Sequence, residues 1–261
     1  MPPDLRQVEG LLLDVDGVLV SDWQPLSGAV DAFARLRELK VPFRLMTNTT
    51  MLSRSGLAAT LAEAGFDVER SELVTAPLAT AALLRSRYPG ARCFLLGAAD
   101  LSEDLEGVTL VDEGADVVVA GADEAFTWEN LNRAFRMLLD GATHVAMHRN
   151  LSWLTGGRLA LDAGAYVAGL EEAAGVKALV AGKPSSDFFR QAVALLGMPA
   201  ERVAMVGDDL QNDVLAAQAL GLTGVLVRAG ESRPGPAGRP AGKPDHVIDS
   251  IAELPGALGP R

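Results

Sequence analysis

Two carboxylates stand one residue apart in the stretch Asp14-Val15-Asp16-Gly17. Groups this close repel each other and raise each other's pKa unless a cation neutralises them, so the pair indicates a bound metal. Carboxylate oxygens are hard ligands, which favours Mg2+. The alternative is a solvated turn in which an aspartate caps the loop, and the isolated pair fits that interpretation equally well.

A buried strand is expected to deliver these carboxylates. The apolar run Leu11–Leu13 has no polar break before Asp14, which is typical of a strand buried on both faces of a parallel sheet. Extended backbone would place Asp14 and Asp16 on the same side, and Gly17 would then let the chain turn away. The short segment 18–23 contains both apolar and polar residues, which suits a flap beside the site.

Three further polar patches each follow an apolar, strand-like run. They are Thr47-Asn48 after residues 41–46, Lys183-Pro184 after residues 178–181, and Gly207-Asp208-Asp209 with Asp213 after residues 203–206. Because the carboxyl ends of parallel strands lie along one edge of a sheet, we expect these patches to gather beside Asp14.

Each patch also has a plainer interpretation. Thr47 and Asn48 could close a turn, and Lys183 could be a solvated lysine at the start of a helix. Asp208 or Asp213 could be a helix N-cap that favours the helix dipole. No single patch distinguishes a metal site from these interpretations, whereas the four patches in this order favour the metal site.

Strand-like and helix-like segments alternate along the chain, which predicts an α/β fold built on a doubly wound parallel sheet. Residues 1–77 and 181–261 would form this core. The middle third has its own alternation, including a helix that Thr127 would cap, so residues 78–180 are expected to form an inserted α/β domain.

Composition narrows the class of protein. The 261 residues are 49% hydrophobic and carry a formal net charge of -11, which argues against partners such as nucleic acid or an anionic membrane. Cys93 is the only cysteine, so no intrachain disulfide can form. We expect no membrane span and a cytoplasmic location, because no leader or spanning apolar segment is recognisable in the sequence.

The four patches, in this order, resemble the four signature motifs of the haloacid dehalogenase (HAD) superfamily. The segments Leu170-Glu171, Gly182-Lys183-Pro184-Ser185 and Phe188-Phe189 resemble more narrowly the NagD-like branch, subfamily IIA, and its phospholysine phosphohistidine inorganic pyrophosphate phosphatase group. Only one helix fits between Asp16 and Thr47, so the cap must be the middle insertion. That is the C2-type cap that this branch carries on its Rossmann-like core.

The resemblance implies a phosphatase that hydrolyses a small phosphorylated molecule through an aspartyl-phosphate intermediate. Phosphate monoesters, pyrophosphate and phosphoamino acids all fit this class. Asp14 would attack phosphorus, and Asp16 would protonate the departing oxygen and later accept a proton from water. Lys183 would supply positive charge, while Thr47 and Asn48 would hold phosphoryl oxygens with it.

The resemblance also implies a ligand set for Mg2+. The carboxylates of Asp14 and Asp208 and the backbone carbonyl of Asp16 would hold the ion. Asp209 and Asp213 would orient those ligands.

Four residues of the cap could set specificity, because their stretch lies toward the substrate in this branch: His148, Arg149, Asn150 and Trp153. The resemblance leaves open a homodimer formed through the cap. It also leaves two alternative functions, a phosphotransferase or phosphomutase with the same fold, and a regulatory protein that binds phosphate without catalysis.

Overall fold

The computed structural model of the chain describes residues 3–121, 125–228 and 242–259. The chain divides into two compact units, which are described separately below. Unit 1 comprises Met1–Thr47, Ala58–Val74 and Lys183–Arg261, and unit 2 comprises Asn48–Leu57 and Thr75–Gly182. Unit 2 thus contains the segment 48–57 as well as the insertion expected from the sequence.

Unit 1 is built on a six-stranded sheet. Its order is β15 (His246–Ile248), β14 (Thr223–Val227), β13 (Val203–Gly207), β1 (Gly10–Leu13), β4 (Phe43–Thr47) and β5 (Leu73–Thr75). The central strand β1 pairs in parallel with β13 and β4, so that Leu13 lies opposite Val206 and Leu45. All four residues of β1 are buried, as expected for a strand covered on both faces.

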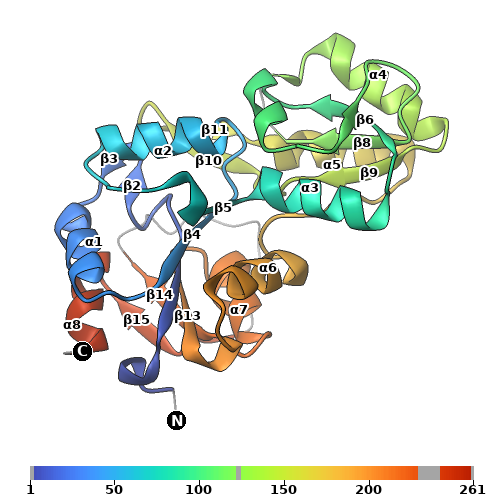
Figure 1. The fold of residues 1–261 in the computed structure, drawn as a ribbon. Helices are drawn as coiled ribbons and strands as arrows, with labels where there is room; N and C mark the ends of the chain where they lie inside the picture. Colours follow the sequence, from blue (N-terminus) through green and yellow to red (C-terminus); the bar gives the residue numbers. More distant parts are fainter. Residues whose placement is uncertain (1–2, 122–124, 229–241, 260–261) are drawn as a thin grey trace. The chain divides into compact units, whose positions relative to one another are not determined.

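Helices cover both faces of this sheet. Figure 1 shows α1 (Ala29–Glu38) and α8 (Leu254–Leu258) on one side, and α6 (Ser186–Leu196) and α7 (Ala216–Gln218) on the other. The α/β doubly wound architecture predicted from the sequence is therefore confirmed. Phe33 of α1 packs edge-on against Phe43 of β4, with ring centroids 5.0 Å apart. The N-cap of α1 is Gly28, which adopts the left-handed conformation.

The segment expected to form a flap begins a hairpin of two short strands. Strand β2 (Val20–Ser21) pairs antiparallel with β3 (Gln24–Pro25), immediately after the Asp14–Gly17 stretch. The backbone N–H of Gly17 donates to the carbonyl of Val20 at 2.7 Å, which closes the turn.

Unit 2 has a five-stranded sheet of its own. Its order is β12 (Leu179–Val180), β9 (Thr143–Ala146), β8 (Val117–Ala120), β6 (Arg92–Leu96) and β7 (Thr109–Leu110), with every neighbouring pair parallel. A separate hairpin joins β10 (Ser152–Thr155) and β11 (Arg158–Leu161).

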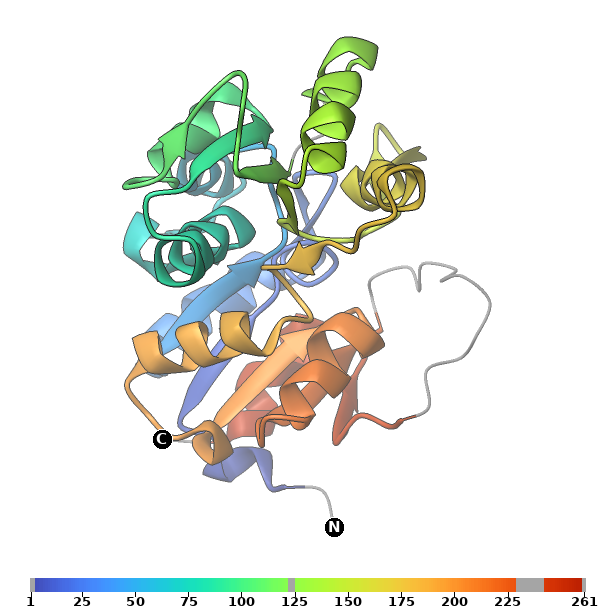
Figure 2. The ribbon, with the colours of Figure 1, turned by 90° about the vertical axis from the view of Figure 1, so that its right-hand side faces the viewer.

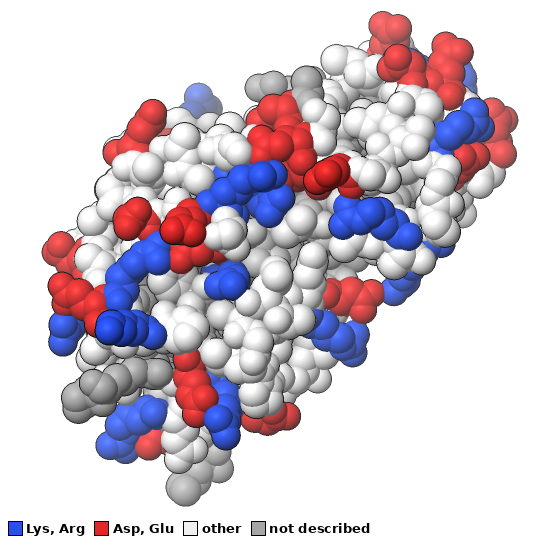
Figure 3. Space-filling view, viewed as in Figure 1, with Lys and Arg blue, Asp and Glu red and all other residues white. Residues whose placement is uncertain are grey.

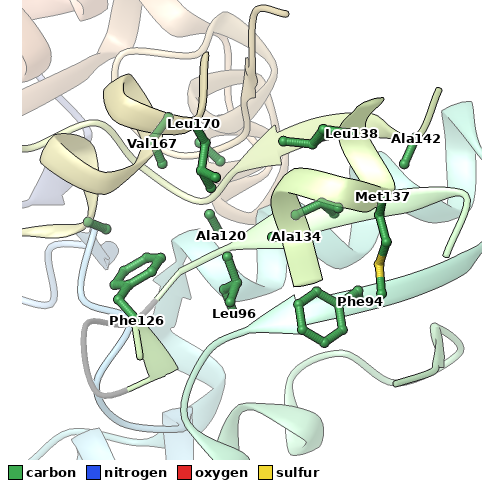
Figure 4. Packing of buried hydrophobic residues seen from close by; sticks show 13 residues of the cluster. Phe94, Leu96, Ala120, Phe126, Ala134, Met137, Leu138, Ala142, Val167 and Leu170 are labelled. Carbon is green, nitrogen blue, oxygen red and sulfur yellow. The ribbon is translucent and has the colours of Figure 1, made fainter. Parts of the chain in front are cut away.

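One helix covers one face of this sheet and two cover the other. Figure 2 shows α3 (Ala76–Arg87) across the sheet from α4 (Trp128–Leu139) and α5 (Ala163–Ala174). Between the sheet and the helices α4 and α5 lies a buried core that includes Leu96, Met137 and Leu170 (Figure 4). The predicted cap of α4 is confirmed, since the hydroxyl of Thr127 accepts the backbone N–H of Asn130. The hydroxyl of Thr75 caps α3 in the same way by accepting the N–H of Leu78.

Among the described residues, the remaining elements are the α-helix α2 (Arg54–Glu63) and several helical turns. The 3-10 turns are η1 (Leu5–Gln7), η2 (Arg70–Glu72), η3 (Ala99–Glu103), η5 (Ala200–Arg202) and η7 (Ile251–Glu253), and η6 (Leu210–Leu215) is a π-helical turn. Across the described ranges, none of the helices combines the length and the apolar character needed to cross a membrane. Acidic and basic side chains are interspersed on the face drawn in Figure 3.

Candidate active site

Asp14 leaves the sheet at the carboxyl end of its central strand. Its backbone N–H still donates to the carbonyl of Val206, at 2.9 Å, so the backbone is held by β13. Its carboxylate oxygen Oδ1 accepts the N–H of Val15 at 2.8 Å, and the residue is only 6% exposed. Asp14 is therefore a buried carboxylate with a fixed orientation, whereas Asp16, two residues on, is half-buried.

Lys183 bridges two of the buried carboxylates. Its Nζ lies 2.7 Å from Oδ1 of Asp14 and 2.8 Å from Oδ1 of Asp213. Lys183 and Asp213 are 5% and 0% exposed, so these charges are almost entirely shielded from water. Low effective dielectric strengthens such contacts and makes each partner costly to remove.

The protonation states of this cluster follow from burial and charge. Burial lowers the pKa of Lys183, but the carboxylates of Asp14 and Asp213 outweigh burial and raise that pKa, so Lys183 stays charged. Burial and the neighbouring charge of Asp14 raise the pKa of Asp213 well above its ordinary value, although Lys183 opposes this. The cluster holds more negative charge than one lysine can neutralise.

The same edge of the sheet offers a set of metal ligands. Asp14, Asp208 and Asp213 each present one carboxylate oxygen, and these oxygens all lie within 4.8 Å of one another. Three hard oxygen donors in this space suit a small divalent cation, so the residues present fit the metal expected from the sequence. Asp213, predicted only to orient the ligands, is itself a candidate ligand.

Two glycines allow the acids to approach the backbone. Gly17 has a φ of 81° and faces Asp208 so closely that a Cβ would collide with its carboxylate. A Cβ on Gly207 would likewise collide with the carboxylate of Asp213. Gly17 was expected to turn the chain, but no pattern of residues predicted the role of Gly207.

The side chain of Asp209 caps a helical turn, whereas Asp208 and Asp213 belong to the carboxylate cluster. Its Oδ1 accepts the N–H groups of Gln211 and Asn212, each at 2.9 Å, so it caps the turn η6. The idea that Asp208 or Asp213 is this N-cap is therefore wrong. The buried acid Asp213 lies four positions after the cap, and residue type alone could not assign the two roles.

Thr47 and Asn48 lie where the chain passes from unit 1 to unit 2. Thr47 is the last residue of β4 and is 1% exposed. Asn48 is 8% exposed, and its Oδ1 would lie 2.5 Å from a Cβ added to Gly182, the residue before Lys183. Thr47 thus ends a strand adjacent to β1, while Asn48 packs against the end of unit 2.

The predicted specificity residues lie after β9 in unit 2. Arg149 pairs with both carboxylate oxygens of Glu171, at 2.9 Å each, and His148 is 3% exposed. Asn150 and Trp153 are half-buried, the latter within β10. The guanidinium of Arg149 is thus engaged in a bidentate ion pair inside this unit, which the sequence did not reveal because Glu171 is far away in the chain.

Comparisons with known proteins point to one family. A family model for haloacid dehalogenase-like hydrolases matches residues 11–111, and a model described as HAD-hydrolase-like matches residues 180–254. The chain is 35% identical over 255 residues to the phospholysine phosphohistidine inorganic pyrophosphate phosphatase of Mus musculus, covering 95% of this chain and 93% of that protein.

Solved structures extend the similarity to the whole fold. A 4-nitrophenylphosphatase from Thermotoga maritima matches with a TM-score of 0.89 and 32% identity, over 98% of this chain and 99% of that one. NagD from E. coli K-12 matches with a TM-score of 0.83 and 30% identity, over 94% and 98% of the two chains.

Proposed function

The chain belongs to the haloacid dehalogenase-like hydrolase family and is a phosphatase of that family, and on this premise we propose that it hydrolyses a small phosphorylated molecule with the help of Mg2+. The reaction would pass through an aspartyl-phosphate on Asp14. The observation that carries the proposal is the buried cluster in which Lys183 bridges Asp14 and Asp213 beside Asp208.

In the first step a carboxylate oxygen of Asp14 attacks phosphorus, and the bond to the leaving oxygen breaks. Asp16 donates a proton to that oxygen. Asp14 is suited to the attack because its other contacts fix its orientation, and Lys183 offsets negative charge beside it. Half-buried Asp16 retains the access to solvent that a group exchanging protons needs.

In the second step water attacks phosphorus and the bond to Asp14 breaks. Asp16, now ionised, accepts the proton of that water, so orthophosphate leaves and both aspartates return to their starting states. Thr47 and Asn48, with Lys183, would hold the phosphoryl oxygens in both steps.

Asp14 and Asp208 would hold the Mg2+ ion together with the backbone carbonyl of Asp16, and Asp213 is a further carboxylate within reach of the same cluster. When bound, the ion neutralises charge on the transferring phosphoryl group. Asp209 would act only through its cap of η6.

The substrate class is a phosphate monoester, pyrophosphate or a phosphoamino acid. The name of the mouse relative, with its phospholysine, phosphohistidine and pyrophosphate, supports the last two, and the 4-nitrophenylphosphatase name supports a monoester. The proposal includes a catalytic core of residues 1–77 and 181–261, a cap of residues 78–180 and a cytoplasmic location. Burial raises the pKa of Cys93 to about 11, which fits a thiol that stays reduced.

A release assay tests this proposal. Phosphate release from p-nitrophenyl phosphate, pyrophosphate and phosphohistidine would be measured with Mg2+ or with EDTA. We expect release that requires Mg2+ and is lost in Asp14→Asn, but retained in Asp187→Asn, which alters an exposed carboxylate on α6. Absence of release from every compound by the folded wild-type protein would contradict the proposal.

A further inference from the structure

The segment Asn48–Leu57 directly follows Thr47 in the chain, yet it packs within unit 2. Two sets of contacts fasten it there, one at Thr50 and one at the start of α2. Neither set involves the acidic cluster of Asp14, Asp208 and Asp213. Each set includes buried polar side chains, Thr50 and His148 in the first and Asp104 in the second, which are costly to bury unless they are paired.

The first set is centred on the hydroxyl of Thr50, a residue that is 3% exposed. This hydroxyl donates to the carbonyl of Gly121 at 2.6 Å, and Nε2 of His148 lies 3.3 Å away from its oxygen. Because the N–H of Asn150 donates to Nδ1 of His148 at 3.3 Å, the ring proton lies on Nε2 and is donated to Thr50. Thr50 is thus tied to the loops after both β8 and β9.

The second set joins the first residues of α2 to the carboxylates of 100–104. Asp104, whose side chain is fully buried, accepts both the backbone N–H and Nε of Arg54, at 2.7 and 2.6 Å. Asp100 accepts the N–H of Ser53 at 2.9 Å. These carboxylates satisfy N–H groups that a helix leaves open at its start.

We propose that Thr50 and Asp104 are positioning residues for the phosphate-binding dipeptide Thr47–Asn48. The inference rests on the proposed function, because it takes this dipeptide as the holder of phosphoryl oxygens. Thr50 lies only three residues beyond Thr47, so its two hydrogen bonds restrict the backbone that presents these donors. Donors held in place before the ligand arrives bind it without first being ordered, and a loosened segment binds phosphate more weakly.

Replacement of the Thr50 hydroxyl provides the test. Thr50→Val removes it at constant volume, Thr50→Ser restores it, and Thr80→Val is the matched control. Thr80 is equally buried, and its hydroxyl donates to the Ala76 carbonyl at 2.8 Å within α3. The measurements are KM and kcat with p-nitrophenyl phosphate, the inhibition constant of orthophosphate, and hydrogen exchange of the amides of 48–57.

In Thr50→Val we expect KM and the inhibition constant of orthophosphate to rise together by about three- to tenfold, the factor that one lost hydrogen bond implies. The amides of 48–57 should exchange faster, while Thr50→Ser and Thr80→Val resemble the wild type. Unchanged phosphate binding and exchange in Thr50→Val, or equal defects in Thr50→Ser, would overturn the inference.

Asp104→Asn tests the second contact without touching Thr50, and decides the matter if Thr50→Val does not fold. It should speed exchange at Ser53 and Arg54 and weaken orthophosphate binding, measured by calorimetry. Asp116→Asn is its control, since exposed Asp116 also accepts a backbone N–H and pairs with an arginine, Arg92. Wild-type phosphate binding in Asp104→Asn would contradict the inference. A wild-type protein that binds orthophosphate but releases none from any substrate would contradict the proposed function alone.

Discussion

At the scale of single residues, the charge of Lys183 holds the site together. Its ammonium group lies between Asp14 and Asp213, and all three side chains are buried. Removing one partner of such a group leaves the other charges without compensation, which typically destabilises a protein by about 3 to 5 kcal/mol. If Lys183 acts as proposed, stability and catalysis depend on the same side chain.

Lys183→Met should abolish phosphate release and lower the free energy of unfolding by about 3 kcal/mol. Since a bound cation can offset the uncompensated charge of the buried carboxylates, Mg2+ should restore more stability to this variant than to the wild type. Denaturant titrations with and without Mg2+ measure both effects. Lys177→Met is the control, because that lysine is exposed and pairs with Glu171 at 3.4 Å, away from the acidic cluster. Retained activity in Lys183→Met would contradict the role given to the ammonium group.

Gly17→Ala separates backbone strain from damage to the metal site. A positive φ costs an alanine roughly 1 kcal/mol, and the added Cβ would also push the Asp208 carboxylate away. Gly90→Ala is a matched control, with a φ of 76° and no atom within 4 Å of the new Cβ. Both variants should lose similar stability, but only Gly17→Ala should lose affinity for Mg2+ by calorimetry. Equal Mg2+ affinity in the two variants would show that Asp208 does not depend on this glycine.

At the scale of elements, the sequence was enough to predict that polar residues at the carboxyl ends of β1, β4 and β13 lie along one edge of the sheet. Each apolar run ends in the polar residues that the structure then brings to one edge, because parallel pairing fixes which ends meet. The different places of Asp209 and Asp213 could not be predicted. Both acids follow the same strand, and only the path of η6 makes Asp209 the N-cap and Asp213 a buried carboxylate. The attachment of 48–57 to unit 2 depends on Asp100 and Asp104, which are distant in sequence.

Strand β9 carries a buried histidine, His144, which should make unit 2 sensitive to acid. His144 is 1% exposed, and neither ring nitrogen has a hydrogen-bond partner among the described residues. Burial lowers its pKa to about 4; nearby Glu171 opposes the shift, and Arg149 adds to it. The protein therefore holds this ring neutral at pH values where an unfolded chain would protonate it.

The sign of the pH effect follows from that lowered pKa. Below about pH 6.5 the unfolded chain takes up a proton that folded His144 refuses, so stability falls as the pH drops toward 4. The contribution is about 3 kcal/mol between these limits. Unfolding of wild type and His144→Leu would be compared at pH 7.5 and 4.5. The variant should lose less stability on acidification, and equal losses would contradict the assignment.

At the scale of the whole molecule, metal binding should appear as stability. A ligand that binds only the folded state at 100 times its dissociation constant adds about 2.7 kcal/mol. Mg2+ should therefore raise the Tm of the wild-type protein, and Asp208→Asn should lose most of this increase. Asp209→Asn should lower the starting Tm through its lost cap but keep the increase, because Asp209 lies outside the carboxylate cluster. An undiminished increase in Asp208→Asn would contradict the ligand assignment.

Formation of a phosphoryl group on Asp14 is the central claim, and trapping it is the most direct test. Asp16→Asn would be mixed with p-nitrophenyl phosphate and Mg2+, quenched in acid and mapped by mass spectrometry. Nitrophenolate leaves without much need of a proton, whereas the attacking water still needs Asp16, so the intermediate should accumulate. We expect one phosphoryl group on the peptide that contains Asp14, and none in the double variant with Asp14→Asn. Phosphate release without that adduct, or an adduct that persists in the double variant, would contradict the account.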